Sequence, residues 1–150
     1  MNKKSYLKTF FMTTAFIFSL ALLTSCDKEE IITSTDLSSE ITSYISTHFP
    51  KNTILQVIKD RDGLTKSYEV FLSENVSLEF NRKNEIIDID GITKLPDSVI
   101  PEKILQYVTV NYPSNFITDW ELDDRNQNVQ LNIGIDLEFN MNGDFLRIDN

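Results

Sequence analysis

The sequence predicts an α+β fold. In it, two tandem repeats, each a helix followed by four strands, form one broad antiparallel sheet with the helices packed on one face. Three observations predict this fold. Residues 41–50 and 104–113 place apolar residues at helical spacing and end at a proline. Each segment is followed by short stretches that alternate apolar and polar residues. The two halves of the chain also match each other, which indicates an internal repeat.

The match between the halves sets the boundaries of the repeats. The helical segment that begins at Ile41 returns 63 residues later at Ile104. The strand segment Leu78-Glu79-Phe80-Asn81 returns 59 residues later as Leu137-Glu138-Phe139-Asn140. We therefore expect repeats at about residues 36–90 and 97–150, within a single domain of residues 36–150.

Four strands are expected after each helix. Asp62-Gly63 and Asn142-Gly143 are tight hairpin signals, and residues 91–97 connect the two repeats. The expected strands cover residues 53–60, 66–73, 76–81, 85–90, 115–123, 128–133, 135–141 and 144–148.

Strict alternation assigns each strand residue to one of two faces. The apolar face must lie under the two amphipathic helices, because no other apolar surface is available to cover their apolar sides. Its expected members are Tyr68, Val70, Leu72, Val76, Leu78, Phe80, Ile87, Ile89, Val129, Leu131, Ile133, Ile135, Leu137, Phe139, Leu146 and Ile148.

The opposite face is expected to remain open, and it is the candidate ligand-binding surface. Aromatic residues within an acidic rim would suit a partner with a basic, partly apolar surface. The candidate binding residues are Glu69, Phe71, Glu79, Ile86, Asp88, Asp136, Glu138 and Phe145.

Residues 1–25 have the pattern of a signal peptide. A cationic start precedes the uncharged stretch Phe10–Leu23, which is shorter than the roughly 20 residues that cross a bilayer. Leu23-Thr24-Ser25-Cys26 then resembles the lipobox of bacterial lipoproteins. Cys26 is the only cysteine, so no disulfide partner competes for its thiol. We expect Cys26 to carry the lipid, palmitate included, that anchors the protein to a membrane; the alternative is a plain secretory leader before an incidental cysteine.

Residues 26–35 are expected to form a solvated tether between the lipid and the domain. Cys26-Asp27-Lys28-Glu29-Glu30 also resembles an export signal that brings lipoproteins to the cell surface in some Gram-negative bacteria. We therefore expect an outer membrane lipoprotein of a Gram-negative bacterium, on the periplasmic side or the cell surface. The sequence leaves the choice of side and the oligomeric state open.

These features together resemble a known family. A helix that ends in Phe-Pro or Tyr-Pro, strands around Leu-Glu-Phe-Asn and a closing hairpin occur twice behind a lipobox. This arrangement is similar to the PepSY-like family, also described as beta-lactamase-inhibitor-like, over residues 36–150. The resemblance implies helices on one face of a broad antiparallel sheet, with the other face free. In the true beta-lactamase inhibitor that free face and its loops grip the enzyme. The inhibitor's repeats carry disulfides, which this chain has no cysteines to form, and no inhibitory residue can be carried over.

Charge restricts the partners. The chain has 14 basic and 23 acidic residues, and removing the three lysines of the leader takes the formal net charge from −9 to −12. Such a surface repels phosphate, which argues against nucleic acid as a partner. The four glycines form no phosphate-cradling run, and no cofactor is expected.

The sequence argues against an enzyme. His48 is the only histidine, so a catalytic triad or a zinc site lacks its partners. A carboxylate pair at the repeat mates Glu79 and Glu138, and a calcium loop at Asp60-Arg61-Asp62-Gly63, are weaker interpretations than an open face and a hairpin turn. We expect a non-catalytic protein- or peptide-binding module, with inhibition as one form of that binding. The alternative is a structural or envelope-stress lipoprotein without a dedicated ligand, which should lack a contiguous apolar-aromatic patch.

Asp97-Ser98-Val99 matches a short O-glycosylation signal, which makes Ser98 a candidate modification site. The alternative role for Ser98 is the N-cap of the second helix.

Substituting the lipobox cysteine tests whether the protein is lipid-anchored. Cys26→Ala should leave an unlipidated precursor, because the thioether to the lipid needs a thiol and the neighbouring Thr24 and Ser25 have only hydroxyl groups. Radiolabelled palmitate should enter the wild-type chain and not the variant. Equal labelling of both chains would contradict the lipobox interpretation.

Overall fold

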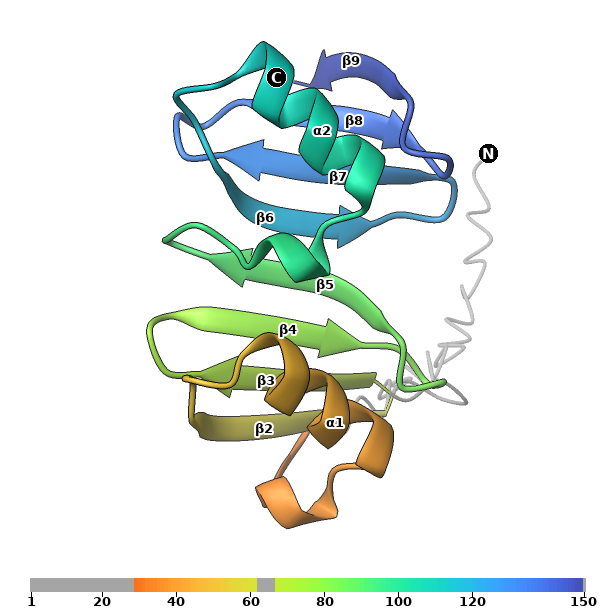
Figure 1. Cartoon of the computed structure of the whole chain (residues 1–150). Coiled ribbons are helices and arrows are strands. Elements are labelled where there is room, and N and C mark those ends of the chain that lie inside the picture. The colour runs from red at the N-terminus through yellow and green to blue at the C-terminus, as the bar shows by residue number, and fades with distance from the viewer. Residues whose placement is uncertain (1–28, 62–66, 150) are drawn as a thin grey trace, which may run out of the picture.

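The structure, a computed structural model, describes residues 29–61 and 67–149 and has the predicted α+β class. Helices α1 (Ser39–His48) and α2 (Glu102–Asn111) lie on the same side of one antiparallel sheet, each over its own repeat (Figure 1). The leader, Cys26 and the Asp62-Gly63 turn signal lie outside the described residues.

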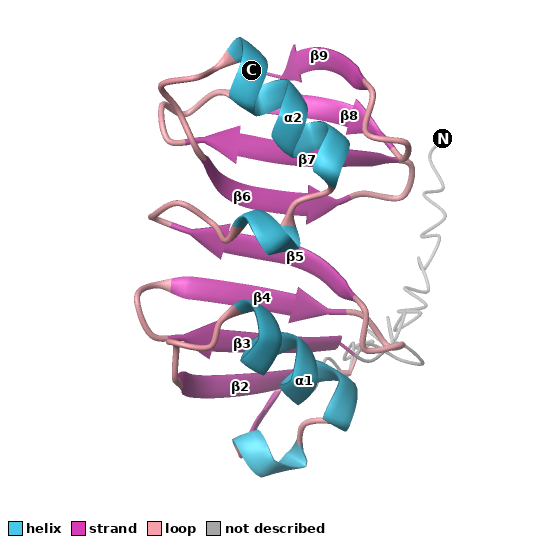
Figure 2. Ribbon diagram, in the orientation of Figure 1, coloured by secondary structure: helices cyan, strands magenta, loops and turns pink. Residues whose placement is uncertain are grey.

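The sheet is a nine-stranded meander in which sequence neighbours are also spatial neighbours (Figure 2). Four strands per repeat appear as predicted, and the ninth, β1, is an addition. Its strands are β1 (Glu30–Ile32), β2 (Ile54–Asp60), β3 (Ser67–Leu72), β4 (Val76–Phe80), β5 (Ile86–Gly91), β6 (Ile117–Leu122), β7 (Asn126–Leu131), β8 (Asp136–Asn140) and β9 (Phe145–Asp149).

Strand β1 corrects the predicted tether of residues 26–35. Glu30, Ile31 and Ile32 pair with Lys59, Ile58 and Val57 of β2, so the folded unit begins before residue 36. A short 3-10 helix, η1 (Ser34–Asp36), then turns the chain toward α1. A capping box between Thr33 and Asp36 closes this turn. From this strand Ile32 packs against the core, whereas Ile31 remains 74% exposed.

Both helices end as the proline rule predicts. The backbone N–H of Phe49 donates to the carbonyl of Ile45, and that of Tyr112 donates to Val108, at 2.8 Å in both cases. Pro50 and Pro113 follow directly. At the other end of α1, the Ser38 hydroxyl accepts a hydrogen bond from the N–H of Ile41.

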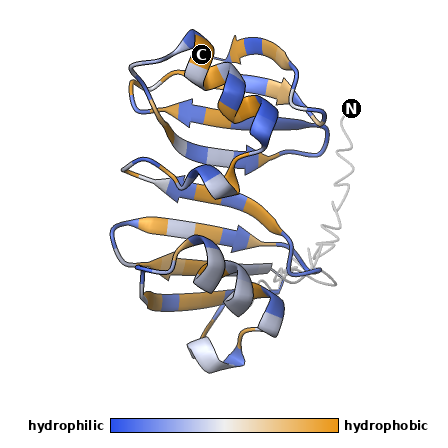
Figure 3. Cartoon of the chain, viewed as in Figure 1, coloured by the Kyte–Doolittle hydropathy of each residue, from blue (hydrophilic) through white to orange (hydrophobic). Residues whose placement is uncertain are grey.

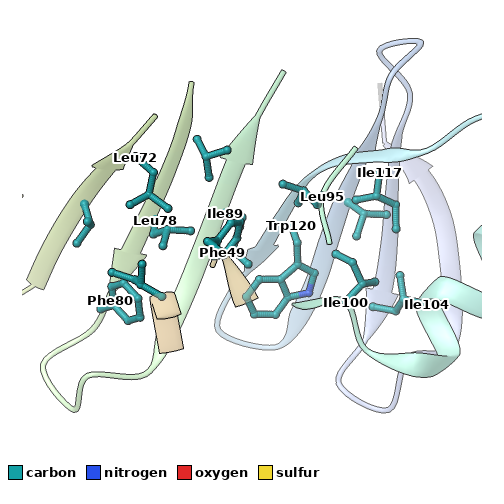
Figure 4. Packing of buried hydrophobic residues seen from close by; sticks show 14 of the residues in the cluster. Phe49, Leu72, Leu78, Phe80, Ile89, Leu95, Ile100, Ile104, Ile117 and Trp120 are labelled. Carbon is teal, nitrogen blue, oxygen red and sulfur yellow. The ribbon is translucent and has the colours of Figure 1, made fainter. Parts of the chain in front are cut away.

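The core lies between the helices and one face of the sheet. Hydrophobic (orange) and hydrophilic (blue) residues alternate along the strands (Figure 3), and successive side chains of a strand point to opposite faces. Tyr44 of α1 meets Phe80 edge-on at 5.6 Å, and its repeat mate Tyr107 meets Phe139 at 5.3 Å. Between the repeats, the core continues without a break. Trp120 lies among Ile89, Leu95 and Ile100 (Figure 4), and its indole N–H donates to the Gln127 side chain at 3.1 Å.

Asparagine ends each Leu-Glu-Phe-Asn segment because it closes the next turn. The Asn81 carboxamide oxygen accepts from the N–H groups of Lys83 and Glu85, and that of Asn140 accepts from Asn142 and Asp144. Each turn contains one residue with positive φ: Asn84 in the first copy and Gly143 in the second. Gly143 also lies against α2, because a Cβ there would come within 2.9 Å of the Lys103 Cβ.

A bulge follows each of these turns and corrects the face assignment of Ile86 and Phe145. Ile86 lies opposite Phe80, and Phe145 lies opposite Phe139, so both point toward the helices. Phe145 stacks on Tyr107 at 4.6 Å. Strict alternation placed them on the open face because it took no account of the extra residue, Ile87 or Leu146, that each bulge inserts.

The covered face is also smaller than predicted at the end of the second repeat. Ile133 in the β7–β8 turn is 52% exposed, and Leu146 and Ile148 of β9 are 49% and 46% exposed. Strand β9 is the last strand of the sheet, so no further described element covers its outer side.

The two phenylalanines should respond differently to truncation. Phe145→Ala removes a ring that packs on Tyr107 and Phe139, and should lower the free energy of unfolding by about 2–3 kcal/mol, less than for a fully buried ring. Phe71→Ala, on the open face, should cost less than about 1 kcal/mol. Urea unfolding of both variants measures the difference. Equal costs would contradict the bulge assignment.

Candidate functional site

The open face carries two rows of side chains that run across the strands. In the first row, the strand register places Glu69, Glu79, Asp88 and Glu121 directly opposite one another on β3, β4, β5 and β6. This row continues through Asn128 and Glu138 to Arg147. The second row contains Phe71, Ser77, Asp90, Asp119, Gln130, Asp136 and Asp149.

The first row contains acids on four consecutive strands with no cation between them. Like charges directly opposite each other in a sheet are destabilising. Partial burial and the neighbouring carboxylate of Glu121 raise the pKa of Asp88 to about 6. Burial also raises the pKa of Glu79, with Glu69, Asp60 and Glu121 adding to the effect. In the second row, burial raises the pKa of Asp119 to about 6, and the adjacent Asp90 contributes.

A hollow of about 470 Å³ lies on the open face where the two repeats join. The sequence predicted an open face, and the structure shows that this part of it is hollowed. Side chains of the seam strands β5 and β6 and of β7, β8 and β9 shape the hollow. Its polar lining is Asp88, Asp90, Asp119, Glu121, Asn128, Gln130, Asp136 and Asp149.

Glu138 differs from the other acids because it is already neutralised. It is only 8% exposed, and one of its oxygens lies 2.5 Å from Nε of Arg147. The Asn126 side-chain amide donates to the other oxygen. Arg147 is the only basic residue in either row, and it lies beside Glu138 and Asp149. No cation of the rows lies beside the acids on β3 to β6.

The structure brings some of the predicted binding residues together and separates others. Glu69, Glu79 and Asp88 are cross-strand neighbours, and Asp136 lines the hollow. Phe71 lies on the same face, half-buried, whereas Ile86 and Phe145 lie on the other. Glu79 and Glu138 are four strands apart, which is about 19 Å and too far for a glycosidase pair.

Four acids of the rows were missing from the predicted site: Asp90, Asp119, Glu121 and Asp149. Alternation along β5 and β6 carries a signal for the first three. Their significance depends on the pairing of β5 with β6, which joins the two repeats at Asp88↔Glu121 and Asp90↔Asp119. A sequence read one repeat at a time does not contain that pairing.

His48 and Ser98 meet in the structure. Nδ1 of His48, the last residue of α1, lies 2.9 Å from the Ser98 hydroxyl. Ser98 belongs to a separate 3-10 helix, η2 (Asp97–Val99), and the N-cap of α2 is Pro101, so the predicted N-cap role of Ser98 is wrong. Its glycosylation stays a prediction.

Two further searches bear on the chemistry. Within residues 29–61 and 67–149, no group of three or more His, Cys, Asp or Glu side chains is arranged to hold a metal ion. Neither of the helices described here is long and apolar enough to span a membrane.

The repeated helix-and-meander fold corresponds to a known family. The pattern of the family described as "Putative beta-lactamase-inhibitor-like, PepSY-like" matches twice, over residues 22–88 and 66–147. The chain belongs to this PepSY-like family. No curated protein matches it.

Solved structures from Bacteroides share the fold. One, described as a "putative calcium-regulated periplasmic protein" from Bacteroides thetaiotaomicron, is 29% identical with a TM-score of 0.77, covering 81% of this chain and 97% of its own. A putative periplasmic protein of the DUF2874 family from Bacteroides vulgatus is 29% identical with a TM-score of 0.78, covering 83% and 99%. A third, of unknown function from Bacteroides vulgatus, is 25% identical with a TM-score of 0.77, covering 82% and 100%. These descriptions support a periplasmic or other envelope location.

The raised pKa values predict an unusual pH dependence. A carboxyl whose pKa is higher in the folded protein than in the unfolded chain stabilises the fold while it is protonated. This stabilisation is complete below the pKa of the unfolded chain, and it is lost as the pH rises through the pKa of the folded protein. For Asp88 and Asp119, that loss runs from about pH 4 to about pH 7.

Asp88→Asn should therefore raise the melting temperature at pH 7.5 and reduce its decline between about pH 4 and pH 7. Asp124→Asn, at an exposed turn, should do neither. Thermal unfolding across this pH range measures both effects. A decline of unchanged steepness in Asp88→Asn would show that its carboxyl does not titrate in this window.

Proposed function

We propose that this PepSY-like domain is a non-catalytic binding module of the cell envelope that holds a basic polypeptide on its open acidic face. The observation that carries the proposal is the run of Glu69, Glu79, Asp88 and Glu121 on four consecutive strands. Such a row costs folding stability. Its natural counterpart is a partner whose cations neutralise the carboxylates and remove that cost on binding.

The spacing of the row suits a regular array of cations. Neighbouring strands are about 4.8 Å apart, so four carboxylates extend over roughly 14 Å. Lysine or arginine side chains three or four residues apart on a helix are about 5–6 Å apart. A basic helix laid across the strands would therefore place successive cations near successive carboxylates, with the hollow at the seam beneath it.

The apolar side chains that would contact the partner lie at one end of the open face. Ile31 of β1 pairs with Ile58 of β2, which pairs with Glu69, and Phe71 lies in the neighbouring row. Ile31 is 74% exposed. These side chains supply a small apolar margin in place of the pair of aromatic anchors predicted from the sequence. Affinity and approach would depend mainly on charge.

The expected location of the protein is the last part of the proposal. A lipid on Cys26 would place the acidic face close to the outer membrane, on its periplasmic side or at the cell surface. Inhibition would follow if the basic partner were an enzyme that uses the same surface. A structural or envelope-stress lipoprotein without a ligand is the competing function, and the binding experiment below distinguishes the two.

Calcium has to be considered because one structural neighbour is described as calcium-regulated. The residues do not fit a built calcium site, since such a site needs six to eight oxygen ligands around one point and no metal-holding group occurs in the described ranges. The carboxylate rows can still attract the ion weakly. Calcium therefore enters the experiment as a cation that competes with the polypeptide.

The test uses the chain from Asp27 to Asn150, which contains every described element, and a synthetic lysine-rich helical peptide. Titration calorimetry at low salt should detect binding that weakens with added NaCl and with millimolar calcium. In the triple variant Asp88→Asn, Asp119→Asn, Glu121→Gln, affinity should fall at least tenfold.

The matched control removes three acids elsewhere: Glu74→Gln, Glu102→Gln and Asp124→Asn, all exposed and outside the rows. It has the same net charge as the first variant and should retain most of the affinity. Equal losses in both variants would show that net charge alone acts. Absence of peptide binding to the wild-type chain would favour the structural alternative. The wild-type and triple-variant chains can then be compared in capture from an envelope extract.

A further inference from the structure

The internal repeat shows what a neighbour of β9 would look like. Strand β5 ends the first repeat, and its outer edge pairs with β6 through Asp88↔Glu121, Ile89↔Trp120 and Asp90↔Asp119. Strand β9 is the matching strand of the second repeat, and it stands last in the sheet. No other described strand pairs with its outer edge.

Burial shows the difference between the two edges. Ile89 of β5 is 0% exposed beside β6, whereas its repeat mate Ile148 of β9 is 46% exposed. Both side chains point to the helix-covered side, since Ile89 lies opposite Leu78 and Ile148 lies opposite Leu137. The missing cover at Ile148 is therefore the place that a further strand would fill.

At the opposite end of the sheet, the first strand of the repeat has a partner strand on its outer side. Strand β2 is the repeat mate of β6, and β1 covers its outer edge. Strand β9 (Phe145–Asp149) contains no proline and no lysine, two residues that commonly protect sheet edges against pairing. Its one cation, Arg147, is directed to the open face, where it pairs with Glu138 and lies 3.7 Å from Asp149 of its own strand.

We propose that β9 is a self-association edge, at which a second copy of this chain pairs its own β9 antiparallel about a twofold axis at Ile148. In this register Ile148 meets its counterpart, while Arg147 faces Asp149 of the second copy and Asp149 faces Arg147. The three pairs around the axis, which involve Arg147, Ile148 and Asp149, are then apolar or oppositely charged. A twofold axis at Arg147 would instead oppose two guanidinium groups, so charge selects Ile148 as the centre. The other edge of the second copy is β1, whose three residues offer a shorter ladder than the five residues of β9.

The pairing has a geometric consequence. A twofold axis perpendicular to the sheet keeps both copies' helices on one side and both acidic faces on the other. The dimer would present one continuous acidic surface to a partner, but the pairing itself does not depend on the proposed function. The contact is a single short strand, smaller than a standard protein interface, so we expect a weak and concentration-dependent dimer.

Cysteine cross-linking tests the register. The chain from Asp27 to Asn150 lacks the only natural cysteine, so Ile148→Cys introduces a single thiol. Under mild oxidation it should form a disulfide-linked dimer at least tenfold faster than Val110→Cys. Val110 is 71% exposed, but on α2. Equal rates for the two variants would overturn the proposed centre.

Sedimentation equilibrium tests the edge without a cross-link. The wild-type mass should rise toward double with concentration, and Ile148→Lys should remain monomeric, because two lysines would meet at the axis. Ile31→Lys makes the same change on the other edge strand and should associate like the wild type. Circular dichroism confirms folding of each variant. A wild-type chain that stays monomeric at millimolar concentration, or association lost only in Ile31→Lys, would overturn the proposal.

Discussion

The structure depends on the burial of one face of the sheet under two short helices. Each helix has ten residues, fewer than an isolated helix needs to be stable in water. The helices therefore persist because Ile41, Ile45, Ile104 and Val108 are buried against the strands. The same contact fixes the strands, since a slip of one residue would move every apolar side chain to the solvent side. The positions of the acids on the open face follow from a register that is set on the other face.

This dependence explains how the acidic rows are tolerated. Repulsion between acids such as Asp88 and Glu121 acts on the same strand pair that Ile89 and Trp120 hold together from the opposite side. Burial of a leucine-sized side chain contributes about 1.5–3 kcal/mol, more than a cross-strand pair of like charges costs. The apolar face can thus carry a charged face that would not hold its strands together alone.

The sequence predicted the repeat, both helices and the eight strands of the repeats to within a few residues, because each depends on local periodicity or on a proline. It misassigned Ile86 and Phe145, since the Asn81 and Asn140 turns end in bulges that alternation cannot register. It missed β1, whose three residues are too few to show a period. It found five of the nine acids in the two rows. Three of the other four, Asp90, Asp119 and Glu121, gain their significance from the pairing of β5 with β6, which no pattern within one repeat contains.

The seam between the repeats joins stability to the proposed binding site. One copy alone, a ten-residue helix over four strands, could bury little apolar surface for its length. Trp120, Leu95 and Ile100 merge the two cores at the seam. The hollow lies behind that seam, on the other face of the same two strands. A cation bound between Asp88 and Glu121 would relieve the repulsion that opposes the pairing of β5 with β6. Ligand binding would therefore tighten the junction of the repeats, and any change that loosens the junction would separate the carboxylates that the ligand needs.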